Sequence, residues 1–315
     1  MGAIVRGIGV YIPEQVLTNA DLEKMVETTD EWIQSRTGIR ERRIVPMDSP
    51  IKASDMGAAA AKHAMARAGV GPEEIDGIIC GAICADKQFP STACFIQAKI
   101  GARNAFAYDV TAACAGFVFA MSIAAPLVES GQCRNVLVIG SELLSRIVDW
   151  KDRNTCILFG DGAGAVVLGR GPQGRGVLQS QLKSDGTLGE ILYVDPPGVN
   201  RGVFMDGKQV FKSAVTVIAD IVTSTLAKSG YSIEDLDLLV MHQANMRILT
   251  AITERLAFPM EKVVVNVDHF GNTSAASVPL ALFEAEQQGR IKPGMLVALA
   301  AVGGGMSWGC NLIRW

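Results

Sequence analysis

Apolar runs and amphipathic stretches alternate along the whole chain and predict an α/β protein with buried strands. Nearly continuous apolar runs at 3–9, 74–82 and 135–140 are typical of strands that are covered on both faces. Alanine-rich or amphipathic segments at 54–68 and 90–100 predict helices between those strands. The 315 residues are enough for one large domain or for two fused ones, each with a sizeable core.

The stretch 107–122 predicts the end of a strand, a tight turn of small residues and a helix that is apolar on every side. Cys114 lies where this helix begins, with Thr111 near the capping position and Gly116 allowing close backbone approach. A helix start favours the thiolate form of a cysteine, which would make Cys114 a nucleophile. The alternative is that Cys114 is a small buried hydrophobe, as most single cysteines are.

The glycine-rich segment 169–176 marks the clearest boundary in the chain, and the sequence beyond it repeats earlier features. Residues 67–79 align without gaps with residues 228–240, and both predict a helix end, a glycine stop, an acidic turn and a buried strand. We therefore expect two similar α/β halves, an N-terminal one at 1–170 and a C-terminal one at 171–315.

A second correspondence between the halves concerns the turn around Cys114. Aligning Gly131 with Gly289 places Cys114 opposite Asn272, which is expected to follow a strand at 263–267. In α/β sheets, ligands gather beyond the carboxyl ends of strands. The repeat thus predicts that matching turns of the two halves meet at one edge.

His242 comes directly after the buried strand predicted at 236–241, and Asn245 is expected to cap the helix that follows. A lone histidine is usually structural, and an asparagine before a helix is usually only a cap. Cys114, His242 and Asn272 nevertheless occupy three turns at the same predicted edge, which favours a shared catalytic role.

The segment 29–43 carries one tryptophan, Trp32, and several arginines, including Arg36. It could be a solvated charged helix with one packed aromatic. It could equally hold a flat ring and phosphate groups, because arginine forks match phosphate oxygens. The sequence alone leaves the two interpretations open.

Composition narrows the class of protein. A net charge of −3 gives no reason to expect nucleic acid as a partner, and no apolar run reaches the length of a membrane span. Seven cysteines form an odd set without framework spacing, which indicates a reducing compartment. Cys80, Cys84 and Cys94 lie in apolar, strand-like surroundings that argue against a metal site. We expect a soluble cytoplasmic protein without metal, nucleic-acid or membrane partners.

Four motifs in the expected order resemble those of the β-ketoacyl-acyl-carrier-protein synthase III family. They are 109–117 around Cys114, 242–245, 271–277 and the glycine run at 302–309. The resemblance implies a thiolase-like fold with five layers, α-β-α-β-α. It also implies an acyltransferase that condenses an acyl-CoA primer, acetyl-CoA by default, with malonyl-acyl-carrier protein and so starts type II fatty acid synthesis. No cofactor is implied beyond the coenzyme A thioester substrate.

The resemblance implies roles for individual residues. Cys114 accepts the acyl group, and His242 and Asn272 serve decarboxylation. Backbone N–H groups of Cys114 and Gly304 are candidates for the oxyanion hole. The residues implied in coenzyme A binding are Trp32, Arg36, Arg153 and Asn245. Those implied in the acyl pocket are Phe89, Leu144, Phe211 and Val302. Those expected to dock the carrier protein are Lys212, Arg247 and Arg255. Phe89 matches the residue that closes the pocket of a neighbouring subunit, so a homodimer is expected.

Several alternatives stay open. A thiolase would carry a second reactive cysteine where this chain has Asn272, which favours decarboxylative condensation. A condensing enzyme with a longer or specialised starter group would keep Cys114, His242 and Asn272 and change the pocket. Val302 and Met306 replace the aromatics of familiar members, and the proline-rich segment 195–201 fits no known pattern. A thioesterase would not need Asn272, and an acyl-CoA-binding subunit would typically have lost one of the three residues.

Overall fold

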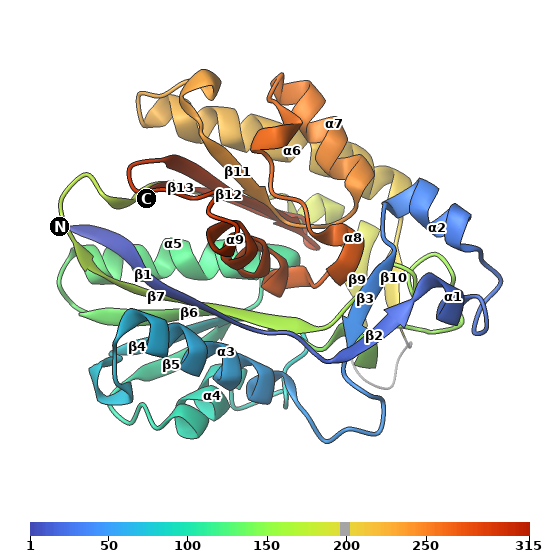
Figure 1. Ribbon diagram of the computed structural model, residues 1–315, viewed down its shortest axis with the longest axis horizontal. Coiled ribbons are helices and arrows are strands. Elements are labelled where there is room, and N and C mark those ends of the chain that lie inside the picture. The colour runs from blue at the N-terminus through green and yellow to red at the C-terminus, as the bar shows by residue number, and fades with distance from the viewer. Residues whose placement is uncertain (196–201) are drawn as a thin grey trace.

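The computed structural model describes residues 1–195 and 202–315, so most of the proline-rich segment lies outside the described residues. Two β-sheets alternate with three layers of helices in the order α-β-α-β-α (Figure 1). The five-layered arrangement expected from the family resemblance is confirmed.

The first sheet has the strand order β1-β7-β6-β4-β5. Strand β4 runs parallel to β5 and β6, whereas β7 is antiparallel to both β6 and β1. The five strands are β1 (Gly2–Tyr11), β4 (Gly77–Gly81), β5 (Phe106–Val110), β6 (Asn135–Glu142) and β7 (Gly162–Gly171). Strand β5 forms one edge of this sheet.

The second sheet has the order β11-β12-β13-β8. Its strands are β8 (Gly176–Ser184), β11 (Leu238–Met241), β12 (Leu296–Gly303) and β13 (Ser307–Arg314). Two small antiparallel pairs stand apart from the main sheets: β2 (Gln15–Thr18) with β3 (Glu41–Ile44), and β9 (Leu192–Val194) with β10 (Val203–Met205).

Helices fill the central layer and cover both outer faces (Figure 1). The central pair is α5 (Gly116–Glu129) and α9 (Ser277–Gln287). The outer helices are α3 (Ala53–Ala68) and α4 (Thr92–Ile100) on the first sheet, and α6 (Gly207–Lys228) and α7 (Met246–Leu256) on the second. The shorter helices are α1 (Asn19–Leu22), α2 (Asp30–Thr37) and α8 (Val267–Phe270).

Small residues bring the layers close together. A Cβ atom on Gly9 of β1 would lie 2.1 Å from the backbone nitrogen of Ala64 in α3, so only glycine fits there. The alanine-rich face of α3 is buried at the same contact, including Ala60 and Ala64. The alanine pattern of this helix therefore reflects close helix–sheet packing as well as helix propensity.

Helix α6 is the one described helix that is long and apolar enough to cross a membrane by length and composition. It is amphipathic, and its residues Ala214, Ile218 and Val222 are buried in the core that it shares with the second sheet. Because its apolar face is already covered by protein, we interpret α6 as an outer-layer helix of the fold.

The first internal repeat is confirmed. Gly69 ends α3 with φ of 64° and Gly230 follows α6 with φ of 76°, the left-handed conformation that glycine adopts at low cost. A short 3₁₀ turn and a buried strand, β4 or β11, follow each glycine. The strands of the first sheet come from residues 2–171 and those of the second from 176–314.

The alignment of the second repeat was wrong by three residues at the turn. Ala113 (φ 45°) and Ser274 (φ 50°) share an unusual left-handed conformation, and each opens a 3₁₀ turn that leads into a central helix. By this backbone match Cys114 corresponds to Ala275 rather than to Asn272. Helix α5 has 14 residues and α9 has 11, so an alignment fixed at the helix ends slips at their starts.

The strand expected at 263–267 was also wrong. Val263 makes an isolated bridge to Leu239, and the four-residue helix α8 follows at Val267. Asn272 reaches the site through this short helix and the bend at Gly271, where a Cβ would lie 2.8 Å from the Leu158 carbonyl oxygen.

Candidate functional site

Cys114, His242 and Asn272 line one cavity of about 1940 Å³. The expectation that they share one sheet edge was wrong, because Cys114 follows β5 of the first sheet and His242 follows β11 of the second. All three side chains are nearly buried, with exposed fractions of 8%, 5% and 7%. Gly304, expected in the oxyanion hole, lines the same cavity. The two halves of the chain therefore supply a single chemical centre.

Cys114 lies in the 3₁₀ turn Ala113–Ala115 that precedes α5. A Cβ on Gly303 would lie 2.6 Å from the Cys114 nitrogen, so the glycine run packs directly against the backbone of this turn. Thr111, expected near the capping position, is exposed, and the cap residue of the turn is Ala112, which makes no side-chain cap.

Burial raises the pKa of the Cys114 thiol to about 12, although a hydrogen bond with Ser274 opposes the shift and the Glu142 carboxylate adds to it. The expectation of a readily ionised thiol at the helix start is therefore wrong for the free protein. Because the thiolate is the nucleophile, Cys114 needs a nearby group to take its proton when it reacts.

His242 follows β11 directly, and its backbone N–H donates to the Ala300 carbonyl at 2.8 Å. Its ring atom Nδ1 lies 2.6 Å from the Ser277 hydroxyl oxygen at the start of α9. Burial lowers the pKa of His242 to about 4, so the ring is neutral at neutral pH. A neutral imidazole can accept or donate one hydrogen bond at the nitrogen facing the cavity.

Asn272 is held by its backbone and by its amide oxygen. Its N–H donates to the Leu158 carbonyl at 2.8 Å, and its Oδ1 accepts from the Ser274 N–H at 2.9 Å. Because the oxygen is engaged, the amide NH₂ is the end available to the cavity as a donor. Asn245 caps α7 as predicted, accepting from the Ile248 N–H at 2.9 Å.

Sequence reasoning missed Glu142, a fully buried carboxylate at the end of β6. One oxygen accepts from the N–H groups of Ile83 (3.1 Å) and Cys84 (3.2 Å), and the other accepts from the Ser274 hydroxyl at 3.0 Å. Burial raises the pKa of Glu142 to about 7 against these hydrogen bonds. No local pattern in the sequence marks a strand-end glutamate as part of the site.

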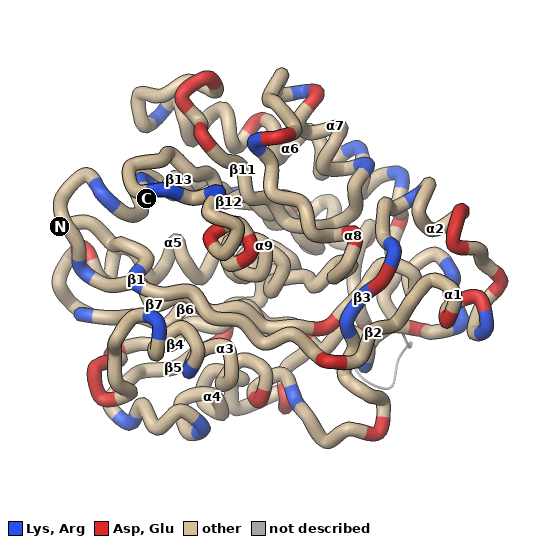
Figure 2. The backbone as a smooth tube through the Cα atoms, viewed as in Figure 1, with Lys and Arg blue, Asp and Glu red and all other residues tan. Residues whose placement is uncertain are grey.

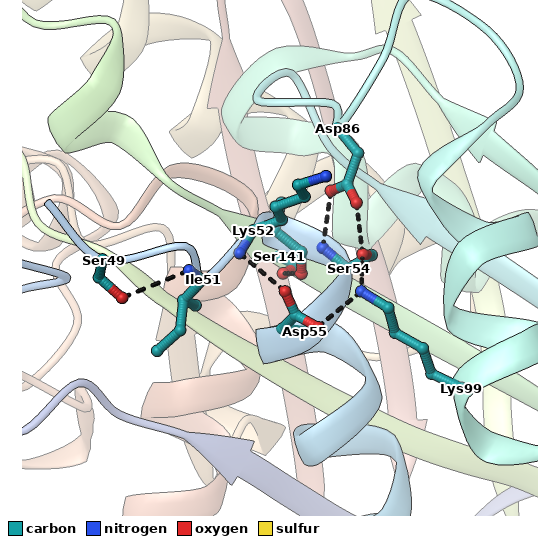
Figure 3. Close-up of polar contacts among 9 residues, drawn as sticks. Ser49, Ile51, Lys52, Ser54, Asp55, Asp86, Lys99 and Ser141 are labelled. Carbon is teal, nitrogen blue, oxygen red and sulfur yellow. Dashed lines mark hydrogen bonds and ion pairs between the residues drawn. The ribbon is translucent and has the colours of Figure 1, made fainter. Parts of the chain in front are cut away.

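A second carboxylate anchors the loop at 82–91, which contributes several residues to the cavity wall. Asp86 accepts from both the N–H and the hydroxyl of Ser54 in the first turn of α3 (Figure 3). Lys99 of α4 reaches Ser54 and the Asp55 carboxylate from the other side. The start of α3 favours the negative charge of Asp86, so this contact stabilises the loop.

Trp32 of α2 forms the expected platform with two arginines. The guanidinium of Arg153 lies 4.9 Å from the indole centroid and that of Arg36 lies 5.6 Å away. Trp32 and Arg36 line the cavity, whereas Arg153 lies outside its lining and donates to the Glu27 carbonyl at 3.0 Å. The binding interpretation of 29–43 gains support from this arrangement over a simple solvated helix.

The residues expected in the acyl pocket separate into two groups. Leu144, Phe211 and Val302 line the cavity, and Met306 joins them. Phe89 is 81% exposed and is absent from the lining of this cavity. Phe89 therefore does not contribute to the pocket of its own chain.

The cationic residues expected to dock a carrier protein differ in their surroundings. Arg247 of α7 lies over the Phe211 ring, 5.8 Å from its centroid, and lines the cavity. Lys212 is exposed on α6, while Arg255 pairs with Asp220 at 3.2 Å beside a separate surface depression. Figure 2 shows basic positions on α7 on the same side of the molecule as α2.

Comparisons with known proteins agree with this geometry. Residues 108–186 match the family model of 3-oxoacyl-[acyl-carrier-protein (ACP)] synthase III, and 226–315 match the model of its C-terminal part. The chain is 47% identical to β-ketoacyl-[acyl-carrier-protein] synthase III of Aquifex aeolicus, over 100% of both chains. It is 51% identical to that of Xanthomonas euvesicatoria, over 99% of this chain and 98% of the relative.

Solved structures give the same picture. The structure of 3-oxoacyl-[acyl-carrier-protein] synthase III from Aquifex aeolicus VF5 superposes with a TM-score of 0.96 at 46% identity, covering 100% of both chains. The priming β-ketosynthase of the R1128 polyketide biosynthetic pathway superposes with a TM-score of 0.93 at 37% identity, covering 99% of this chain and 96% of the other.

Proposed function

We infer the roles of the cavity residues from the premise that the chain belongs to the β-ketoacyl-[acyl-carrier-protein] synthase III family. It is an acyltransferase of the thiolase-like fold, and it condenses acetyl-CoA with malonyl-acyl-carrier protein to start fatty acid synthesis. The convergence of Cys114, His242 and Asn272 on one cavity carries the assignment of its steps to residues.

In the first half-reaction, Cys114 attacks the thioester carbonyl of acyl-CoA. The new S–C bond forms, the C–S bond to coenzyme A breaks, and the proton of Cys114 passes to the leaving sulfur. Because the thiol is protonated at rest, His242 is the group that carries this proton. The N–H groups of Cys114 and Gly304 stabilise the tetrahedral oxyanion, since backbone donors need no reorganisation.

In the second half-reaction, malonyl-acyl-carrier protein loses carbon dioxide and leaves an enolate on its thioester oxygen. The Asn272 amide is oriented to donate to that oxygen because Ser274 holds its Oδ1. The enolate carbon then attacks the acyl-cysteine carbonyl and releases Cys114, which regains a proton from solvent. Decarboxylation supplies the carbanion, so no base strong enough to remove a carbon-bound proton is needed.

Coenzyme A binds at the mouth of the cavity. The indole of Trp32 provides a flat face for the adenine ring, and Arg36 and Arg153 provide cations for the phosphates. Asn245 lines the same cavity and contacts the bound coenzyme A. Both arginines already lie over the indole, which reduces the side-chain ordering that ligand binding requires.

Leu144, Phe211 and Val302 form the acyl pocket, and acetyl is the default primer. A second candidate is a related condensing enzyme with a longer or specialised starter, which the small Val302 and flexible Met306 side chains favour. The likeness to the R1128 priming β-ketosynthase agrees with that alternative. A non-catalytic acyl-CoA-binding subunit is disfavoured, because Cys114, His242 and Asn272 are all in place.

The chain forms a homodimer. Phe89 is 81% exposed, Phe106 is 40% exposed and Tyr108 is 37% exposed, and the last two lie on the edge strand β5. Apolar side chains on an open strand edge are typical of a surface that pairs with a second chain. Phe89 then reaches the acyl pocket of the partner subunit.

The carrier protein docks through Lys212 on α6 and through Arg247 and Arg255 on α7, and Arg247 is the one of the three that lines the cavity. Arg247 contributes most, since it lines the cavity, whereas the charge of Arg255 is partly neutralised by Asp220. The enzyme works in the cytoplasm, where its free cysteines stay reduced.

Separate assays of the two half-reactions test these roles. Asn272→Ala should transfer an acyl group from acetyl-CoA to Cys114 at near the wild-type rate and lose about 10²-fold or more in decarboxylation of malonyl-acyl-carrier protein. Cys114→Ala should lose acyl transfer entirely. Equal loss of both half-reactions in Asn272→Ala would contradict the assignment.

A further inference from the structure

Ser277 contacts the ring of His242 and has a second partner. Its hydroxyl oxygen lies 2.6 Å from His242 Nδ1 and 2.8 Å from the Ser274 carbonyl oxygen. Ser277 is 1% exposed, so water does not replace either partner. A serine hydroxyl carries one hydrogen, which can serve one of these two contacts as donor.

The Ser274 contact requires that hydrogen. Two oxygen atoms at 2.8 Å are at hydrogen-bond distance, and without a hydrogen between them their lone pairs would repel. The carbonyl oxygen of Ser274 cannot donate, so the hydroxyl of Ser277 does. The contact with His242 then needs its hydrogen from the ring, on Nδ1.

We propose that Ser277 is a positioning residue that holds neutral His242 as the tautomer with its hydrogen on Nδ1, leaving Nε2 toward the cavity as a proton acceptor. This inference deepens the proposed function and rests on it for its kinetic consequences. The tautomer itself is a property of the free protein.

The tautomer of His242 has a different consequence in each half-reaction. During acyl transfer, Nε2 accepts the proton of the Cys114 thiol and later gives it to the sulfur of coenzyme A, so His242 returns to its starting form. During condensation, Nε2 can donate to the enolate only after it has taken up a proton from solvent. The whole reaction consumes one proton, because carbon dioxide leaves a carbanion and Cys114 ends as a thiol.

Nuclear magnetic resonance of protein labelled with ¹⁵N at histidine tests the tautomer directly. The chain has three histidines, so His63→Gln and His269→Gln identify the signals of His242 by subtraction. At neutral pH the His242 ring should show a protonated Nδ1 and an unprotonated Nε2. A protonated Nε2 in the wild-type protein would overturn the proposal.

In Ser277→Ala, the tautomer of His242 with its hydrogen on Nε2 should become more populated. Ser277→Thr keeps a hydroxyl and should show the same ¹⁵N signals of His242 as the wild type. Ser224→Ala is a matched control, because Ser224 also donates to a carbonyl three residues earlier (Ile221) and accepts from a side-chain N–H (Gln181). An unchanged tautomer in Ser277→Ala would mean that Ser277 does not set it.

Kinetics supply the second readout. Ser277→Ala should slow acyl transfer to Cys114 by roughly 10-fold or more at saturating acetyl-CoA, with KM unchanged. We expect wild-type decarboxylation to decline as the pH rises, because Nε2 must first take up a proton. Ser277→Ala should lose this decline, since Nε2 of its neutral ring then carries a hydrogen. Equal losses in Ser277→Ala and Ser224→Ala, with unchanged pH profiles, would contradict the proposal. If neither the wild type nor any variant transfers an acyl group to Cys114, the proposed function is wrong. The tautomer of His242, measured on the free protein, is then still established.

Discussion

The hydroxyl of Ser274 donates a 3.0 Å hydrogen bond to the buried carboxylate of Glu142. This bond joins the turn that carries Asn272, in the second half of the chain, to the end of a strand in the first half. Glu142 also holds the backbone of Ile83 and Cys84, so one carboxylate connects the reacting turn with the loop that lines the cavity. The site is thus built across the two halves.

Replacing Glu142 with alanine should destabilise the fold. The change leaves the Ile83 and Cys84 N–H groups and the Ser274 hydroxyl without their acceptor, at a cost of about 2–3 kcal/mol in the free energy of unfolding. Urea unfolding followed by circular dichroism measures this loss. A change within about 0.5 kcal/mol would mean that the carboxylate contributes little.

Glu142→Gln removes the negative charge of the side chain and keeps its shape. Burial raises the pKa of Glu142 from 4.5 to about 7, so the folded state disfavours the charged form. The stability of the wild type relative to Glu142→Gln should therefore fall as the pH rises from about 4.5 to about 7 and then level off. A wild-type advantage that grows over this range would contradict the burial argument.

Trp32→Ala should weaken binding of acetyl-CoA. The indole is stacked by Arg36 and Arg153, and loss of such contacts corresponds to about 1–2 kcal/mol, or roughly a 5- to 30-fold rise in KM. The KM for malonyl-acyl-carrier protein should stay constant, as should kcat. Trp308→Phe is a suitable control, since Trp308 of β13 lies outside the lining of this cavity.

Phe106→Lys should dissociate the proposed homodimer. Phe106 is 40% exposed on the edge strand β5, and a charge there disfavours pairing with a second chain. Light scattering coupled to size-exclusion chromatography should show a shift from twice the chain mass of 33.4 kDa toward the single chain. Phe204→Lys, at an exposed aromatic of β10, should leave the mass of the wild type unchanged.

His269 should also give stability that falls as the pH rises, over a higher pH range than for Glu142. Its hydrogen bond with Asp268 and its ion pair with Glu284 raise its pKa from 6.5 to about 9. The stabilisation is fully present below about pH 6.5 and disappears as the pH rises through about 9. His269→Gln should therefore lower the melting temperature at pH 6 and have less effect at pH 10. An equal effect at both pH values would rule out a charged His269 as the cause.

The alternation of strands and helices could be predicted from the sequence, and the five layers followed from the family resemblance. Buried strands have a strong apolar signal, and the turns that follow β5 in the first sheet and β11 in the second bring Cys114 and His242 to one cavity. The residue types of 29–43 left a solvated helix and a ligand platform equally open, and the contact of Arg153 with Trp32 comes from a distant segment.

Other features depend on tertiary contacts that no local pattern encodes. Ser277 and Glu142 matter because of the residues that face them from distant segments. Arg42, within a segment expected to be solvated or to bind ligands, is fully buried in β3 and donates to Asn19 and Ile157. Burial lowers the pKa of Arg42 to about 10, and its hydrogen bonds explain why a charged residue is accepted there.

Intact-protein mass spectrometry after incubation with a panel of acyl-CoA thioesters tests the central claim most directly. The account predicts one acetyl-sized increase on the wild-type protein and none on Cys114→Ala. Cys84→Ala, which removes another cysteine of the same cavity, is the control and should still be acylated on Cys114. Preferential loading of longer or branched groups would keep the mechanism and change the primer. No adduct from any thioester, or an adduct that persists in Cys114→Ala, would contradict the account.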